Sequence, residues 1–271
     1  MSVTRLDVSL EQYEVGISGA VPDRAEWSEP AMDRGILEFV ALFTGIVMKY
    51  GGRIIHGCHP TFTPIILRQA RQQAGGRLRK PVTLVMSELW AQDLKPEDIE
   101  AMTDIAEFVV TRKFGDKGPD DAETRNRSLS VMRRVLINAQ NTTVAVGGLM
   151  HHGDGLVPGV AEEIALAEQK GIPRFLIGGL GGLTKKLAEN LVPSNLKNSL
   201  SYEQNMTLFS TRDVAACVNV LFEHMAGSKD LAQTALQPIK WNPALHAIID
   251  HRDGTIMLET TSYILRAFAT W

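Results

Sequence analysis

The chain has 271 residues, of which 44% are hydrophobic and 6% aromatic, and its formal net charge is −3. This length and composition suit one large domain, or one domain with an appendage, around an aliphatic core. The small net charge and the lack of long runs of like charge give no reason to expect nucleic acid or an anionic membrane as a partner.

Short apolar segments rich in β-branched residues alternate with segments of helical spacing along most of the chain. The predicted strands cover residues 15–18, 53–56, 81–86, 107–111, 142–146 and 173–177. The predicted helices cover residues 33–49, 63–73, 96–102, 121–139, 159–170 and 212–225. This alternation predicts an α/β fold, with a Rossmann-like parallel sheet covered by helices on both faces.

The alternation stops near residue 227, which divides the chain into two predicted parts. Residues 1–226 form the Rossmann-like domain, and residues 227–271 form a short C-terminal appendage. Within the appendage we expect an edge strand over residues 255–259 and a helix over residues 262–268. The apolar residues of the appendage would pack either on the core or on a neighbouring subunit.

The sequence predicts a cytoplasmic protein. The N-terminus lacks the basic start and apolar run of a signal peptide, and no segment approaches the ~18 apolar residues of a membrane span. The two cysteines, Cys58 and Cys217, are too few for a disulfide framework and form no CxxC pair.

Four of the predicted strands lead into turns made of small residues. In an open parallel sheet these turns gather at the carboxyl edge, where ligands bind. Glycine lets backbone N–H groups approach an anion closely, although glycine is also common in such turns for purely local reasons. Four such turns at one edge favour a phosphate-bearing ligand; the residues concerned are Ser18, Gly19, Gly57, Gly147, Gly148 and Gly179.

An arginine-rich helix and an acidic helix start flank the fifth strand. Arginine forms bidentate hydrogen bonds with phosphate or carboxylate groups. At most one or two of the arginines of this helix can face the ligand; these are Arg125, Arg127, Arg133 and Arg134. The next helix begins at Gly159 and carries Glu162 and Glu163 in its first turn. These glutamates either interact favourably with the helix dipole, or bind ribose hydroxyls and act in acid–base catalysis.

Histidines lie in two of the same turns. His59, next to His56, is expected to line the ligand site, and His151, His152 and Asp154 form a second polar loop. Adjacent side chains on an extended chain point apart, so we expect no metal site. Cys58 beside His59 suggests either a nucleophile with its base or a small buried cysteine, and the second is commoner.

Several of these segments together resemble the SLOG superfamily, which groups lonely-guy phosphoribohydrolases, Smf/DprA proteins and nucleotide-sensing domains. The similarity lies in VGISG (15–19), YGGRIIHG (50–57), RNRSLSVMRRVLINAQNTTVAVGG (125–148) and PGVAEEIALAEQKGIP (158–173). It covers about residues 13–226. The long segment LMHHGDGLVP between Gly148 and Gly159 differs from the glycine–threonine step of the hydrolase branch, so the chain is more similar to the sensing branch.

The resemblance implies binding of a nucleotide or of a ligand derived from NAD or ADP-ribose, as a sensor in a prokaryotic defence or stress system. It also implies a homo-oligomer, and an effector protein as partner. The alternative is an N-glycosidic-bond hydrolase in which Glu162 or Glu163 is catalytic. A purely structural role, in which the glycines serve turns only, is the third possibility. In the first two cases the expected ligand-binding residues are Ser18, Gly19, Gly57, His59, Arg127, Arg133, Gly147, Gly148, Gly159 and Gly179.

Overall fold

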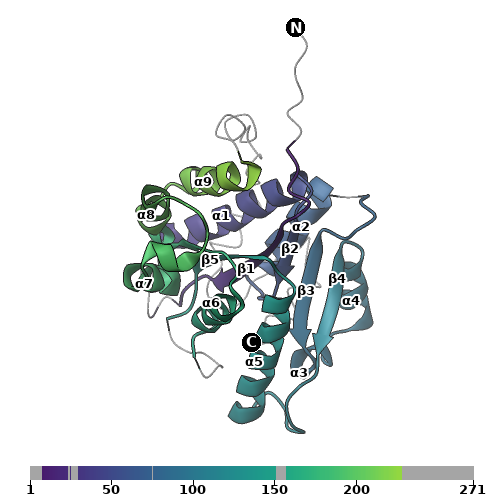
Figure 1. Ribbon diagram of the computed structural model, residues 1–271. Coiled ribbons are helices and arrows are strands. Elements are labelled where there is room, and N and C mark those ends of the chain that lie inside the picture. Colours follow the sequence, from purple (N-terminus) through teal and green to yellow (C-terminus); the bar gives the residue numbers. More distant parts are fainter. Residues whose placement is uncertain (1–7, 24, 26–29, 75, 151–156, 228–271) are drawn as a thin grey trace.

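The computed structural model describes residues 8–23, 25, 30–74, 76–150 and 157–227, which are drawn in colour in Figure 1. These residues form a six-stranded, entirely parallel sheet. The strands are β1 (Glu14–Ala20), β2 (Arg53–His56), β3 (Val82–Ser87), β4 (Ala106–Thr111), β5 (Thr142–Gly147) and β6 (Arg174–Ile177).

Helices follow each strand and cover both faces of the sheet. The α-helices are α1 (Pro30–Lys49), α2 (Thr63–Ala74), α3 (Glu88–Ala91), α4 (Pro96–Thr103), α5 (Ala122–Asn138), α6 (Gly159–Lys170), α7 (Gly182–Asn190), α8 (Tyr202–Ser210) and α9 (Val214–Ala226). Two short 3₁₀ helices, η1 (Gly178–Leu180) and η2 (Pro193–Leu196), follow β6 and α7.

The strand order is β4-β3-β2-β1-β5-β6. The chain first builds the sheet outward from β1 to β4, then crosses back and adds β5 and β6 on the other side of β1. The order therefore reverses between β1 and β5, which are paired from Val15 with Thr142 to Ala20 with Gly147. In doubly wound α/β sheets this switch point is where ligands bind.

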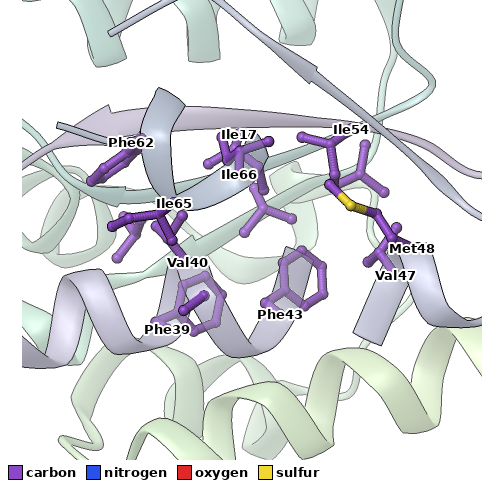
Figure 2. Packing of buried hydrophobic residues seen from close by; sticks show 14 of the residues in the cluster. Ile17, Phe39, Val40, Phe43, Val47, Met48, Ile54, Phe62, Ile65 and Ile66 are labelled. Carbon is purple, nitrogen blue, oxygen red and sulfur yellow. The ribbon is translucent and has the colours of Figure 1, made fainter. Parts of the chain in front are cut away.

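The larger core lies between the sheet and the layer of α1, α2 and α9. The apolar face of α1 contributes Phe39, Val40 and Phe43, whose side chains are almost fully buried. Figure 2 shows these side chains and those of α2 facing Ile17 of β1 and Ile54 of β2. The rings of Phe39 and Phe43 are stacked, with centroids 5.4 Å apart. This packing fixes β1, and with it the switch point, in the centre of the domain.

The opposite face is covered by α5 and α6. Met132 and Leu136 of α5 pack on Ile55 and Val85. A separate cluster joins α6 and α7 to β5 and β6 around Ala145 and Leu176. Figure 1 shows α5 and α6 together on this side, with α1, α2 and α9 on the other. The start of α6 is thereby held against β1.

One buried arginine connects four strands near their amino ends. Arg53 of β2 donates from Nη1 to Glu14 of β1 at 3.0 Å, and from Nη2 to Glu107 of β4 at 2.7 Å. The same Nη2 lies 2.8 Å from the hydroxyl oxygen of Thr83 of β3, and Nε donates to the carbonyl of Lys80 at 2.9 Å. Only 7% of Arg53 is exposed, so its charge is compensated almost entirely by the protein.

The predicted fold class is confirmed: the described chain is an α/β Rossmann-like fold. Each strand and helix predicted within residues 1–226 is present, and the bounds of α6 match the prediction for residues 159–170. The prediction ended the first strand at residue 18, whereas β1 continues to Ala20, so Ser18 and Gly19 lie within the strand and not in a turn. Three helices were not predicted from the sequence: the four-residue α3, and α7 and α8, which together with η1 and η2 occupy most of residues 178–210.

The helix α9 ends at Ala226, and the next residue, Gly227, adopts a left-handed conformation that suits a helix end. The predicted appendage, with its edge strand and helix, lies outside the described residues from residue 228 onward, so the division into two parts stays a prediction. Within the described part of the chain, none of the helices has the length and apolar character needed to cross a membrane.

Candidate functional site at the switch point

The ends of β1 and β5 are in direct backbone contact. The N–H of Gly148 donates to the carbonyl of Ala20 at 2.7 Å. A Cβ on Gly147 would lie 2.3 Å from that same carbonyl oxygen, and a Cβ on Gly19 would lie 2.0 Å from the carbonyl oxygen of Val146. Glycine is therefore required here so that the two strands can approach, which is a structural role whether or not a ligand binds.

The start of α6 meets α5 through Arg133. A Cβ on Gly159 would lie 2.7 Å from Nη2 of Arg133, so the first residue of α6 must be small to leave room for the guanidinium group. Pro158, the N-cap residue, provides no side-chain hydrogen bond to the first turn of α6. Among the described residues no side chain caps this turn, and its N–H groups and the guanidinium group are both attractive to an anion.

Two glutamates of α6 converge on Arg133. Its Nη1 donates to Oε2 of Glu162 at 2.5 Å, and its Nε lies 3.7 Å from Oε1 of Glu163. The three side chains are between 10% and 16% exposed. One guanidinium group thus faces two carboxyl groups in a largely buried place, an arrangement that leaves one carboxyl group undercompensated.

Glu163 is that undercompensated group. Burial raises its pKa and the nearby Glu162 adds to the rise, whereas Arg133 and the hydroxyl of Ser18 oppose it. Ser18 lies on β1 and is 3% exposed. Its Oγ makes no hydrogen bond of ordinary geometry, although it is near enough to favour the ionised carboxylate of Glu163. A carboxyl group with a raised pKa beside an unsatisfied hydroxyl is typical of a functional site.

The raised pKa of Glu163 predicts a pH dependence of stability. The folded state holds this proton more tightly than the unfolded chain, so the free energy of unfolding should fall as pH rises from the ordinary glutamate pKa through the raised one. The substitution Glu163→Gln should remove this contribution and flatten the profile, measured by urea unfolding at a series of pH values. Glu123→Gln, on the exposed surface of α5, is the control and should leave the profile unchanged. A wild-type slope retained in Glu163→Gln would contradict the assignment.

The loop after β2 lies next to β1 but carries no positive charge at neutral pH. Burial lowers the pKa of His56 to about 4, and burial followed by the charge of His56 lowers that of His59 to about 4. Nδ1 of His56 lies 3.1 Å from the carbonyl of Ile17, which only accepts, so Nδ1 carries the proton. The Nδ1 of His59 accepts from the N–H of Thr61, which leaves Nε2 as the donor of a neutral ring. His59 can offer a ligand a hydrogen bond but not a charge.

The other predicted ligand-binding residues lie apart from this cluster. Arg127 is on the exposed side of α5, where its guanidinium group lies 4.3 Å from the centre of the Phe114 ring and pairs with Glu123. Gly179 is buried, and a Cβ there would lie 1.9 Å from the carbonyl oxygen of Thr211. Gly57 faces Met132 of α5 at ordinary contact distance. Contact of these residues with a ligand stays a prediction.

One residue near the switch point was not predicted. The N–H of Leu183, in the first turn of α7, donates to the carbonyl of Gly148 at 3.1 Å, which holds this helix start against the end of β5. The next residue, Thr184, is fully buried, and its hydroxyl has no hydrogen-bond partner. The sequence signal that could have indicated this helix start, and with it Thr184, is the glycine pair Gly181-Gly182 directly before a short amphipathic segment.

Histidine and cysteine chemistry receives little support from the described residues. Where side chains are described, no group of three or more His, Cys, Asp or Glu gathers as metal ligands would. His151, His152 and Asp154 lie outside the described residues. Burial raises the pKa of the Cys58 thiol, so Cys58 is a buried thiol and not an activated nucleophile.

The fold and the cluster of Ser18, Arg133, Glu162 and Glu163 define the class: a doubly wound α/β domain with a charged site at its switch point. The chain belongs to the family described as SLOG cluster2, whose model matches residues 77–240, more than half of the chain. The resemblance to the SLOG superfamily is thereby confirmed. Membership associates the chain with nucleotide-related binding or glycosidase-like activity.

A solved X-ray structure, titled as the structural-genomics target TM1055, is similar over 78% of this chain and 99% of its own. The sequence identity is 16% and the TM-score is 0.48. No curated protein sequence matches the chain.

Proposed function

We propose that the chain binds a nucleotide, or a ligand derived from NAD or ADP-ribose, at the switch point between β1 and β5. The observation that carries the proposal is the convergence of Arg133, Glu162 and Glu163 beside the start of α6, which no described side chain caps. The guanidinium group and the N–H groups of this helix start suit a phosphate, and carboxyl groups suit ribose hydroxyls. The phosphate and the ribose of a nucleotide would therefore each find a matching group in this cluster.

The biological role that we propose is sensing, in a prokaryotic defence or stress system. Arg133 is already neutralised by Glu162 in the free protein, so a phosphate would have to compete with that carboxylate. Ligand binding would then change the ion pair that joins α5 to α6. A change at a helix–helix contact is a signal that a further subunit or an effector protein can read.

A second candidate function is hydrolysis of an N-glycosidic bond, favoured by the raised pKa of Glu163. In this reaction water adds to C1′ of the ribose, the C1′–N bond breaks, and the base leaves with a proton. A carboxyl group with a raised pKa can donate that proton to the leaving base, and an ionised neighbour such as Glu162 can stabilise the positive charge that develops on the sugar.

The experiment that tests binding is thermal unfolding with nucleoside monophosphates, ADP-ribose and NAD as separate probes. A ligand present at 100 times its Kd stabilises the folded state by about 2.7 kcal/mol, which raises the Tm by several degrees. Arg133→Lys keeps the charge but loses the forked geometry and should abolish the shift. Arg71→Lys, which changes a surface arginine of α2 paired with Asp104, is the matched control and should retain it.

Chromatography of the same mixtures separates the two candidates. Release of free base by the wild type, lost in Glu163→Gln, supports hydrolysis. A thermal shift without base release supports sensing. If no probe shifts the Tm and none is cleaved, binding of a nucleotide-type ligand at this site is wrong.

A further inference from the structure

The described chain forms a cleft at the end of the sheet opposite to the switch point. It lies where β1, β2 and β3 begin, between the end of α1 and the loop that joins α2 to β3, and its volume is about 720 Å³. Small-molecule sites in proteins have volumes of roughly 300–1,000 Å³. The four side chains of the switch-point cluster do not line this cleft, so it is a separate feature of the molecule.

The wall of the cleft at the end of α1 is fixed by close backbone contacts. The N–H of Leu10 donates to the carbonyl of Tyr50 at 2.7 Å. Gly51 has a φ of +101°, in the region that favours glycine, and a Cβ there would lie 2.7 Å from Cγ of Glu11. The segment before β1 and the turn after α1 are therefore held together by the chain itself.

Basic side chains predominate in the cleft, although the whole chain has a net charge of −3. The charged side chains that line it are four basic ones and one acidic one: Lys49, Arg53, Arg77, Arg79 and Glu11. Arg53 and Arg79 both donate to Oε1 of Glu14, at 3.0 Å and 2.5 Å. In the described chain, Lys49 and Arg77 form no ion pair. Two cations thus share the cleft with one further carboxylate, which leaves positive charge in excess.

Arg77 is held in place by a contact that leaves other donors available. Its Nη2 donates to the carbonyl of Met48 in the last turn of α1, where the helix dipole attracts a cation. Its Nη1 and Nε donate to no group of the described chain. The N–H groups on these two nitrogens can therefore bind an anion, and a side chain that is already anchored loses little entropy when it does so.

The cleft also offers apolar contacts beside its cations. Leu78, which lies between Arg77 and Arg79 in the sequence, is fully exposed. Pro81 and Tyr50 line the same cleft. A simple inorganic ion would leave these side chains uncovered, whereas an organic anion would bury part of their apolar surface.

We propose that this cleft binds a small organic anion, in which a phosphate or carboxylate group is attached to an apolar body. The anionic group would lie between Arg77 and Lys49, and the apolar body would lie against Leu78. The ligand and its site differ from the nucleotide-type ligand proposed at the switch point, and the two proposals do not depend on each other.

The test is a titration of the full chain followed by NMR of its backbone amides. Phenyl phosphate and benzoate are the anionic probes, and benzyl alcohol is the neutral one. Amides of residues 49–53 and 77–80 report this cleft, and those of residues 147–148 and 159–163 report the switch point, so each site gives its own Kd. We expect the better anion to bind the cleft about tenfold or more tightly than benzyl alcohol, because only the anion forms charge-assisted hydrogen bonds.

Three variants test the charged side chains one at a time. Arg77→Gln should raise the Kd at the cleft about tenfold or more, and Lys49→Gln about threefold. Glu11→Gln removes the opposing carboxylate and should lower the Kd about threefold, a gain that a loss of folding cannot produce. Lys186→Gln, on the exposed surface of α7, is the matched control and should bind as the wild type does.

Three results would overturn the proposal. The first is that neither anion shifts the amides of the cleft, even if the amides at the switch point respond. The second is that benzyl alcohol binds the cleft as tightly as the anions. The third is that Arg77→Gln and Glu11→Gln both leave the Kd unchanged. None of these results bears on the nucleotide-type site, whose amides are followed separately.

Discussion

Replacing Arg133 by alanine should lower the free energy of unfolding by about 3–5 kcal/mol at neutral pH, because it leaves the largely buried carboxyl groups of Glu162 and Glu163 without their cation. This loss of stability comes from the unpaired buried charges, and urea unfolding measures it. It should shrink as the pH is lowered and the glutamates become protonated. Arg127→Ala, which removes a half-exposed arginine from the same helix, should cost about 1 kcal/mol or less.

The triple variant Arg133→Met, Glu162→Gln, Glu163→Gln separates this charge effect from packing. It removes the cation together with both carboxylates and keeps similar side-chain volumes. Much of the stability lost in Arg133→Ala should return, because no unpaired charge remains. A cost for Arg133→Ala that is independent of pH and equal in the triple variant would show that the arginine acts by packing alone.

Replacing Arg53 by alanine should cost about 1–3 kcal/mol in unfolding free energy, since a buried guanidinium group loses its hydrogen bonds to Glu14, Glu107 and groups preceding or within β3, while both carboxylates stay partly exposed to water. Urea unfolding monitored by circular dichroism measures it. The matched control is Arg71→Ala, which removes a more exposed arginine paired with Asp104 at 3.0 Å. That surface pair should contribute about 0–1 kcal/mol.

Hydrogen exchange of the backbone amides should show which strands are destabilised when Arg53 is replaced. The strands β1 to β4 should exchange faster in Arg53→Ala, whereas β6, which has its own contacts to η2, should keep more of its protection. If Arg53→Ala costs no more than Arg71→Ala, the connection of four strands by Arg53 contributes no more than an ordinary surface ion pair.

The strands and most helices could be predicted because their local patterns agree with the fold. The segment TTVAV predicts a buried strand, and the start of α6 at Gly159 and its end at Gly171 follow from the glycines themselves. For β1 the local pattern was misleading, since Gly16 and Gly19 are unfavourable in a strand. Gly16 is needed because the side chain of Gln140 occupies the space where a Cβ would stand. That requirement is tertiary and has no local signal.

The two longer helices that were not predicted, α7 and α8, were missed for different reasons. The start of α8 carries a complete capping box between Ser201 and Gln204, a sequence signal that the prediction overlooked. The start of α7 has no side-chain cap and follows directly on the glycine cluster. It is held instead by the contact of Leu183 with Gly148, which only the folded chain provides.

The residues proposed for the site could be selected from the sequence, although their contact with a ligand stays a prediction; how they pair could not. Sequence analysis selected Glu162, Glu163 and two arginines, and could not decide which arginine faces the glutamates. The phase of α5 would have helped, because Arg133 stands four residues before the buried Ile137, whereas Arg127 and Arg134 fall on the exposed side. The raised pKa of Glu163 had no sequence signal, since it depends on how β1, α5 and α6 meet.

The glycine contacts between β1 and β5 have a thermodynamic consequence. With Gly19 against Val146 and Gly147 against Ala20, the two strand ends touch main chain to main chain and have little freedom to separate. A molecule that docks on this rim meets a surface that is already ordered, so association loses little conformational entropy there. Substituting a larger residue at Gly147 would therefore weaken association through a looser rim, even for a ligand that never touches that residue.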